Sequence, residues 1–267
     1  MRYAITCAMM LIIASGCAAT YVTPGAGAKM QLFAAPAGAT AMDQAKNTDD
    51  GIKQILDKKP LASFPASVAL VRVQAPGYRS HTACGIGSGR YSVITTRDVE
   101  ADTDLQKLDK LPMLRGIAAL NRLVIGDDFQ SDYELREAAA KMHADMVLVY
   151  TIDTQFLDVD HVTPLSIVTL GASTTKNMRV ISTASAALID TRSGYVYGLA
   201  EGSKRHEELQ NAWKTEDEID RTRRENESQA FAQMVDNLQL TWTGIAQAYA
   251  TPMRTTAGAG TRYETMK

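Results

Sequence analysis

The chain has 267 residues, a formal net charge of −2 at pH 7 and only 6% aromatic residues. That length suits one globular domain with flexible ends. The nearly balanced charge excludes the strongly basic surface of most nucleic-acid-binding proteins, so we expect no nucleic-acid partner.

The first sixteen residues are typical of a secretory leader. Arg2 supplies a positive charge, an apolar run extends from Ala4 to Ile13, and the small residues Ala14-Ser-Gly16 precede Cys17. The apolar run is about ten residues, well short of the ~20 that a membrane-spanning helix needs. This order resembles the lipobox of bacterial lipoproteins. The resemblance implies cleavage between Gly16 and Cys17, and acylation of Cys17.

The expected location follows from the same resemblance. By the sorting habit of that family, Ala18 after the acylated cysteine implies attachment to the outer membrane, facing the periplasm. The alternative is an ordinary secretory leader with a chance cysteine. After removal of the leader and acylation of Cys17, Cys84 has no partner left, so no structural disulfide is expected.

Composition predicts the domain organisation. The expected parts are a leader (1–16), a flexible tether (17–49), a short helix and lead-in (50–64), an α/β domain (65–250) and a disordered tail (251–267). The tether is rich in Ala, Gly, Thr and Pro and cannot bury a core. Asp50 is positioned to cap the short helix, and Pro60 ends it.

The first part of the domain alternates strands and helices. Strands are expected at 67–74, 91–95, 120–125 and 146–152, and a helix at 102–111. Ser131 and Glu134 form a capping box for a further helix, which a short turn joins to the strand at 146–152. A helix followed so closely by a strand favours an α/β layer.

The second part predicts a hairpin and a long helix. Strands at 179–189 and 195–201 flank a turn from Asp190 to Gly194. A period-3.6 apolar stripe predicts a helix over 215–249, whose charged first part, 216–227, is expected to be a solvated face. The expected fold is therefore α/β (α+β), with a single mixed sheet, a C-terminal antiparallel hairpin, and helices packed on the sheet that include a long C-terminal one.

Much of this region resembles the rhombotarget-type lipoprotein family of bacteria. The matching stretches are residues 91–98, 144–154, 164–171 and above all 182–198. More distantly, the strand after Asp145 and the following hairpin are similar to the periplasmic α/β domain of curli-secretion-type and penicillin-binding-protein-activator lipoproteins. The resemblance implies binding and assembly roles rather than catalysis, and fold analogy alone is a weak argument for function.

The sequence contains no recognisable catalytic motif. A nucleophile elbow, a zinc-binding cysteine pair and an HExxH motif are all missing from it. We therefore expect no catalytic residues, no metal site and no cofactor.

One apolar run between polar loops is a candidate contact with a partner. Its apolar side chains belong to Leu165, Ile167, Val168 and Leu170. The alternative is a buried core strand, because short apolar runs are usually buried. The contact interpretation assigns this run to an exposed insertion that packs on another chain or on lipid.

These features predict a non-catalytic outer-membrane lipoprotein that acts as a protein-binding or assembly module of the cell envelope. Its expected partners are the outer membrane, through the lipid, and an envelope protein or a second copy of the chain. The first alternative is an oligomeric secretion pore of the curli-secretion type. An envelope hydrolase is the third hypothesis.

Cys17→Ser tests the lipid anchor. We expect this variant to lose acylation and to remain uncleaved or become soluble, because the acylated residue is gone. The measurement is partitioning between membrane and soluble fractions. A variant that still partitions with outer membranes like the parent would contradict the assignment.

Overall fold

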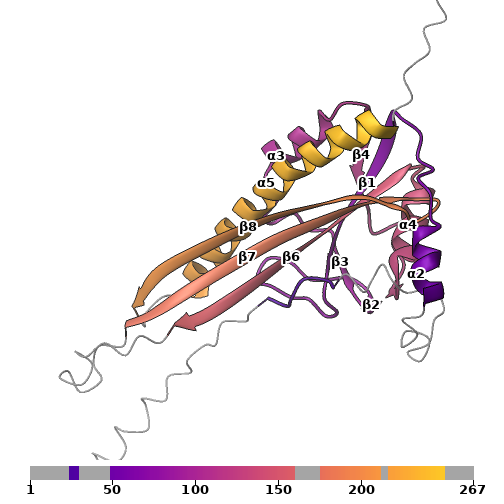
Figure 1. Ribbon diagram of the computed structural model, residues 1–267. Helices are drawn as coiled ribbons and strands as arrows, with labels where there is room; N and C mark the ends of the chain where they lie inside the picture. The colour runs from indigo at the N-terminus through magenta and orange to yellow at the C-terminus, as the bar shows by residue number, and fades with distance from the viewer. Residues whose placement is uncertain (1–23, 30–48, 160–174, 212–215, 250–267) are drawn as a thin grey trace, which may run out of the picture.

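The computed structural model describes residues 24–29, 49–159, 175–211 and 216–249 (Figure 1). The predicted cleavage and lipidation residues Gly16 and Cys17 lie outside this part of the chain. So do the predicted contact segment Leu165–Leu170 and the predicted tail at 251–267.

One mixed sheet organises the chain. Its strands lie in the order β3 (Ser92–Ile94), β1 (Ala66–Gln74), β6 (Met146–Val159), β7 (Thr175–Asp190) and β8 (Val196–Asn211), with β4 (Leu114–Ala119) also paired to β1. Strands β4 and β6 run parallel to β1, whereas β3, β7 and β8 run antiparallel to the strand each adjoins. Separately, β2 (Ser88–Gly89) pairs with β5 (Asp128–Phe129). The predicted fold class is confirmed.

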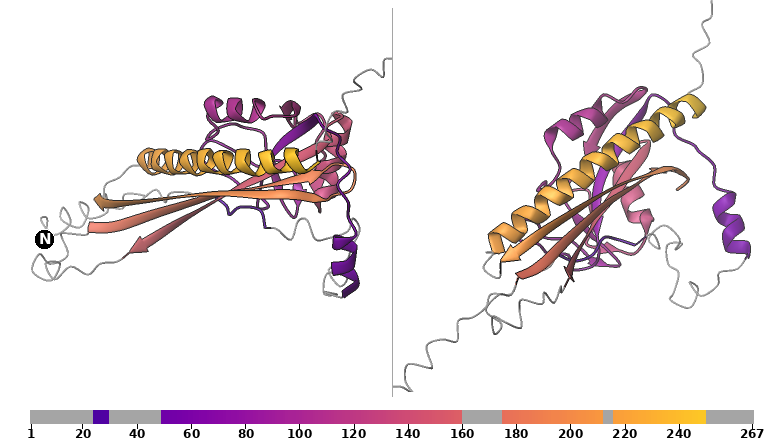
Figure 2. Two further views of the ribbon diagram at one scale, coloured as in Figure 1. Left: turned by 45° about the horizontal axis from the view of Figure 1, so that its top comes forward. Right: turned by 60° about the vertical axis from the view of Figure 1, so that its left-hand side comes forward.

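Helices cover the two faces of the sheet unequally. Helices α3 (Asp102–Asp109) and α5 (Glu216–Tyr249) pack on one side, which we call the covered face (Figure 2). Helix α4 (Asp132–Lys141) packs on the other side over β1, β6 and the turn end of the β7–β8 hairpin. We call this second side, over the rest of β6, β7 and β8, the open face. Helix α2 (Asp49–Leu56) exposes its apolar residues and stands apart from the sheet in Figure 1.

The three long strands extend further than the sequence predicted. Strands β6, β7 and β8 have 14, 16 and 16 residues, and they run past the rest of the sheet with α5 lying along them (Figure 1). The prediction stopped at Ile152 and Glu201 because the following residues are polar and do not alternate with apolar ones. These residues stay in the ladder because each strand has its neighbour as a partner over the whole length.

The predicted strand at 120–125 is wrong. The parallel partner of β1 is instead β4, just before it, and the chain turns after Asn121. Leu120 is buried and donates its backbone N–H to Leu70, but Leu123 is 92% exposed. Apolar composition suggested the wrong segment because β4 is only half-buried and contains glycine and alanine, which are poor strand formers.

The long helix packs closely on the hairpin, as its apolar stripe predicts. Phe231, Met234, Leu238 and Trp242 are all buried against the covered face. At Gly202 the two backbones approach so closely that a Cβ would lie 2.3 Å from the Met234 nitrogen. A glycine is therefore required at this point of β8.

Asp190 connects the turn between β7 and β8 to residues 61–62, which lie just before β1. Its carboxylate accepts hydrogen bonds from the backbone N–H groups of Leu61 and Ala62 at 2.6 and 2.7 Å and from the Tyr197 hydroxyl at 2.9 Å. It also accepts the turn N–H groups of Arg192 and Ser193. Gly194 closes the predicted turn with φ of 68°, a left-handed conformation that glycine adopts without steric cost. One carboxylate thus orders two segments far apart in sequence.

Asp190→Asn tests this joint. Burial disfavours the charge on Asp190, but the hydrogen bonds from Ser193, Leu61, Tyr197 and Arg192 together lower its pKa below the ordinary value of 3.8. We expect the variant to lose at least about 2 kcal/mol in the free energy of unfolding at pH 7, because hydrogen bonds to a charged group are lost.

The pH dependence has a definite sign. A carboxyl group with a lowered folded pKa stabilises the fold above its unfolded pKa and loses this contribution as the pH falls through the folded value. The difference between parent and variant should therefore narrow below about pH 3.8. Denaturant unfolding from pH 7 to pH 2 measures it, with the exposed Asp109→Asn as the control. A difference that stays constant over this range would contradict the prediction.

Candidate functional site

The charged first part of α5 is not the solvated face that the sequence predicted. Asp220, Arg223, Asn226 and Glu227 are 4%, 0%, 3% and 2% exposed, so this stretch buries one charged side of the helix. The charged side chains of α5 can be buried because other segments supply partners for them. The long strands and the 78–100 segment contribute hydroxyl groups, and β1 and the 78–100 segment contribute charges of opposite sign. We call the resulting group the buried charge cluster; it consists of Arg72, Tyr78, Thr82, Asp98, Glu100, Tyr150, Thr154, Asp220, Arg223 and Glu227.

Arg72 is the contribution of β1 to the buried charge cluster. Its guanidinium lies 2.8 Å from Asp98 and 3.3 Å from Glu100, measured from Nη1. Its Nη2 lies 4.0 Å from Glu227 and donates to the Tyr78 hydroxyl at 3.4 Å. The Arg72 Nε has no hydrogen-bond partner among the described residues. Three separate segments therefore meet at one guanidinium.

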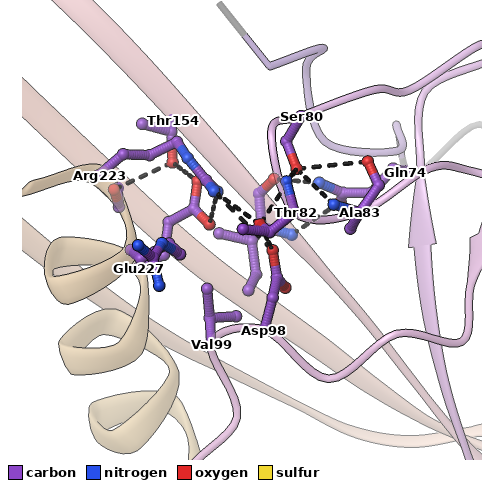
Figure 3. Close-up of polar contacts among 12 residues, drawn as sticks. Gln74, Ser80, Thr82, Ala83, Asp98, Val99, Thr154, Arg223 and Glu227 are labelled. Carbon is purple, nitrogen blue, oxygen red and sulfur yellow. Dashed lines mark hydrogen bonds and ion pairs between the residues drawn. The ribbon is translucent and has the colours of Figure 1, made fainter. Parts of the chain in front are cut away.

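Arg223 is the matching cation on α5 (Figure 3). It donates from Nη1 to Glu227 at 2.6 Å and from Nε to Asp220 at 3.0 Å, both within the same helix. It also donates from Nη2 to the Thr82 hydroxyl at 3.2 Å, and that hydroxyl donates to Asp98. Arg223 thus connects α5 to the 78–100 segment.

Glu227 connects α5 to the strands. It accepts a hydrogen bond from the Thr154 hydroxyl of β6 at 2.8 Å, and that hydroxyl lies 3.0 Å from Ser182 Oγ of β7. Asn226, one position earlier on α5, donates to Ser182 at 2.9 Å. These contacts reach the middle of the long strands, where apolar packing gives way to polar side chains.

The charges in the buried charge cluster are almost balanced. Three arginines, Arg72, Arg223 and the half-exposed Arg224, face four carboxylates, which leaves one surplus negative charge. The carboxylates belong to Asp98, Glu100, Asp220 and Glu227. Burial raises the pKa of Glu227, although Arg223 and Arg72 favour its charged form. Burial also opposes the charge on Arg72 and Arg223, but the surrounding anionic groups outweigh it and raise both pKa values. Both arginines therefore keep their charge, whereas burial works against the charge on Glu227.

This arrangement is suited to holding elements together rather than to chemistry. Arg72, Arg223 and Glu227 are each at most 2% exposed, so no substrate reaches them. Burial also raises the pKa of Tyr150, which donates to Glu100 at 2.7 Å and stays protonated. Among the described side chains, no group of three or more His, Cys, Asp or Glu residues is arranged to hold a metal ion.

The accessible candidate site is a groove on the open face, with a volume of about 660 Å³. Its floor is formed by β6, β7 and β8, and one wall is formed by residues 26–29. The lining side chains used below belong to Lys29, Val149, Thr151, Asp153, Ser185, Ala187, Leu199 and Glu201. Leu199 is 55% exposed, whereas Val149 and Ala187 are buried below it.

The wall of the groove comes from the range that composition predicts to be a tether. Gly27 pairs with Gln74 of β1 and donates its N–H to Asp153 at 3.2 Å. Ala28 donates its N–H to the Thr151 hydroxyl at 2.7 Å. A Cβ at Gly27 would lie 2.9 Å from that hydroxyl, so the close approach requires glycine. Composition did not indicate this contact, because it depends on polar side chains far away in β6.

Polar side chains pair across the open face beside the groove. Ser185 donates to Glu201 at 3.0 Å, and the hydroxyls of Thr183 and Ser203 lie 3.1 Å apart. Such cross-strand pairs are typical of a sheet face that is in contact with water. The groove therefore presents a mixed surface, with one exposed leucine among hydroxyl and carboxylate groups.

The sites that the structure shows are built from residues that the sequence analysis did not single out. The four predicted contact residues and Cys17 lie outside the described residues, and Cys84 is exposed in a loop. Two signals in the sequence could have revealed the buried charge cluster. Arg72 interrupts an otherwise apolar strand, and Arg223 and Glu227 lie four residues apart on the same side as the apolar stripe of α5. The groove gives no local signal, because its walls come from distant segments.

No protein-family model and no curated protein matches the chain. Among solved structures, it is similar to a lipoprotein from Caulobacter crescentus, at 12% identity and a TM-score of 0.24, over 43% of this chain and 80% of that one. A lipoprotein from Neisseria meningitidis matches at 12% identity and a TM-score of 0.27, over 59% and 94%. A homologue of a neuraminyllactose-binding hemagglutinin from Helicobacter pylori matches at 10% identity and a TM-score of 0.34, over 71% and 95%.

These TM-scores are too low to assign the chain to a family, so the resemblance to rhombotarget-type lipoproteins stays a prediction. In the described ranges, no helix has both the length and the apolar character that crossing a membrane requires.

Arg223→Met tests the buried charge cluster. We expect it to lower the free energy of unfolding by about 3–5 kcal/mol, because it leaves Glu227 buried without its closest cation and removes one of the two arginines that pair with Asp220. The control is Arg224→Met, the next residue, which pairs with Asp220 at 2.9 Å but is 42% exposed. A half-exposed pair contributes at most about 1 kcal/mol.

The cost of Arg223→Met should also depend on pH. Without Arg223, the pKa of Glu227 rises further. A carboxyl group whose folded pKa is raised destabilises the fold increasingly as the pH rises from the unfolded pKa towards the folded one. The loss should therefore be larger at pH 8 than at pH 5 in denaturant unfolding. Equal losses for the Arg223 and Arg224 variants would show that the cluster does not hold α5.

Proposed function

We propose that this protein is a non-catalytic, lipid-anchored module of the cell envelope that binds an extended segment of another envelope protein. The observation that carries this proposal is the groove on the open face. It is the site where accessible apolar and polar groups come together, whereas the charged groups of the buried charge cluster are occupied with one another.

The contacts of residues 24–29 bear on where such a module would act. If Cys17 is acylated, only seven peptide steps separate the lipid from Pro24, which spans at most about 24 Å. A free tether of residues 17–49 would reach much further. Because Gly27 and Ala28 are bound to β6, the groove would stay near the membrane surface.

The lining of the groove favours a polypeptide partner over a small charged substrate. Backbone groups of residues 26–29 form one wall, and Leu199 supplies an exposed apolar contact. Lys29, Asp153 and Glu201 lie along the lining with both signs of charge, so they do not select an ion of one sign. A strand-like segment with one apolar side chain fits this combination.

Leu199→Asp tests the groove. A photo-crosslinking residue in place of Glu201, on the lining, is activated in intact cells that carry the full chain. We expect one discrete crosslinked protein with the parent, and loss of that adduct with Leu199→Asp. The melting temperature should hardly change, because this side chain is 55% exposed.

The matched control is Leu240→Asp. Leu240 is 76% exposed on α5, on the opposite side of the sheet from the groove. This variant should keep the adduct. The proposal fails if Leu199→Asp leaves the adduct unchanged, if both variants abolish it, or if no discrete adduct forms.

A further inference from the structure

Strand β8 is the last strand of the sheet and has a free outer edge. The backbone groups that point outward from such an edge are a ready template for another strand. Ser203 donates its N–H outward, to α5 rather than to β7. Because outward-pointing residues alternate in an antiparallel pair, residues 199, 201, 203, 205 and 207 all face the free edge.

Helix α5 occupies the first half of this edge with three side chains at four-residue spacing. Gln233 accepts the N–H of Ser203 at 3.0 Å. Asn237 donates to the carbonyl of Glu201 at 2.7 Å, and Thr241 donates to the carbonyl of Leu199 at 3.4 Å. These residues thereby bind three of the outward backbone groups from Leu199 to Ser203, and a further strand could be added there only by displacing them.

The cover ends after Ser203 because α5 shifts inward along the strands. Asn226, further toward the start of the helix, contacts Val180 and Ser182 of β7 as well as the carbonyl of Lys204. Across the described ranges, no hydrogen bond from α5 reaches the backbone of Arg205 or Glu207. Both side chains are 54% exposed and form an ion pair with each other, and Glu207 also pairs with Arg179 at 2.7 Å. Within the part of the chain that the structure describes, α5 therefore leaves the backbone of the second half of the edge uncovered.

We infer that this open half of the β8 edge pairs with the same edge of a second copy of the chain, antiparallel and centred on His206. The sequence from Lys204 to Glu208 reads Lys-Arg-His-Glu-Glu. In this register Arg205 lies opposite residue 207 of the other copy, and Lys204 lies opposite residue 208. Every charged position therefore meets the opposite charge, so the ion pair that Arg205 and Glu207 form within each chain would extend across the new strand pair, which stabilises cross-strand pairing.

The same register matches the hydrogen-bonding pattern. Arg205 and Glu207 both face outward, so each pair of opposed residues can exchange two backbone hydrogen bonds. The ladder stops at Ser203, whose N–H is already bound to Gln233. The helix thus restricts the pairing to a short central stretch and fixes its register. The inference goes beyond the proposed binding function, because it depends on neither the lipid nor the groove.

Disulfide crosslinking of the full-length chain tests this pairing, in a Cys84→Ser background that removes the exposed thiol. In the inferred register the two residues 206 face each other with Cα atoms about 4.5 Å apart, within the range of a disulfide. Under mild oxidation, His206→Cys should give a crosslinked dimer in a fraction at least about fivefold above that of Lys204→Cys. The two residues 204 would be about 14 Å apart, too far to crosslink.

Charge reversal in the His206→Cys chain provides the second measurement. Arg205→Glu and Glu207→Arg should each lower the crosslinked fraction several-fold, because like charges then face each other, and the double exchange should restore it. Melting temperatures identify any variant that does not fold. Equal crosslinking at positions 204 and 206, or crosslinking that is insensitive to charge reversal, would overturn the inference. The charged side chains on this edge would then serve to prevent pairing with other strands.

Discussion

Arg72 and Arg223 bring two positive charges into the interior, and four carboxylates surround them. Each of these groups would be costly to bury alone, because desolvation of a charge in a protein interior costs several kcal/mol. They are therefore stable only when β1, the 78–100 segment and α5 are all in place. This mutual requirement fixes the first part of α5 on the long strands, where apolar packing is thin.

The position of α5 determines which surfaces of the hairpin stay accessible. At its C-terminal half, Gln233, Asn237 and Thr241 close the outer edge of β8. At its N-terminal half, the contacts of Glu227 with Thr154 and Arg72 and of Arg223 with Asp98 hold the helix over β6, β1 and the 78–100 segment, away from that edge. The open face, in turn, receives residues 24–29 instead of a helix. The uncovered stretch of the β8 edge thus follows from the buried charge cluster, whereas the groove follows from the contacts of residues 24–29 with β6.

Local patterns in the sequence predicted most of the fold. The capping box of Ser131 and Glu134, the turn from Asp190 to Gly194 and the apolar stripe of α5 each depend on residues close together in the chain. The sites depend on residues far apart, such as Arg72 with Glu227 or Ala28 with Thr151, and no local pattern reports such pairs. The charges of 216–227 were expected to be solvated because charged helix faces usually are. Their burial requires partners that the periodicity of one helix does not reveal.

Hydrogen exchange of the full chain with Arg72→Met would test most directly whether the buried charge cluster holds α5 on the strands. Arg72 is on β1, so this substitution removes a partner of Glu227 without altering α5 itself. The account predicts faster exchange in residues 216–230 and 78–100, with protection retained in α4 and in the start of β6. Uniformly faster exchange, or no change in α5, would contradict it.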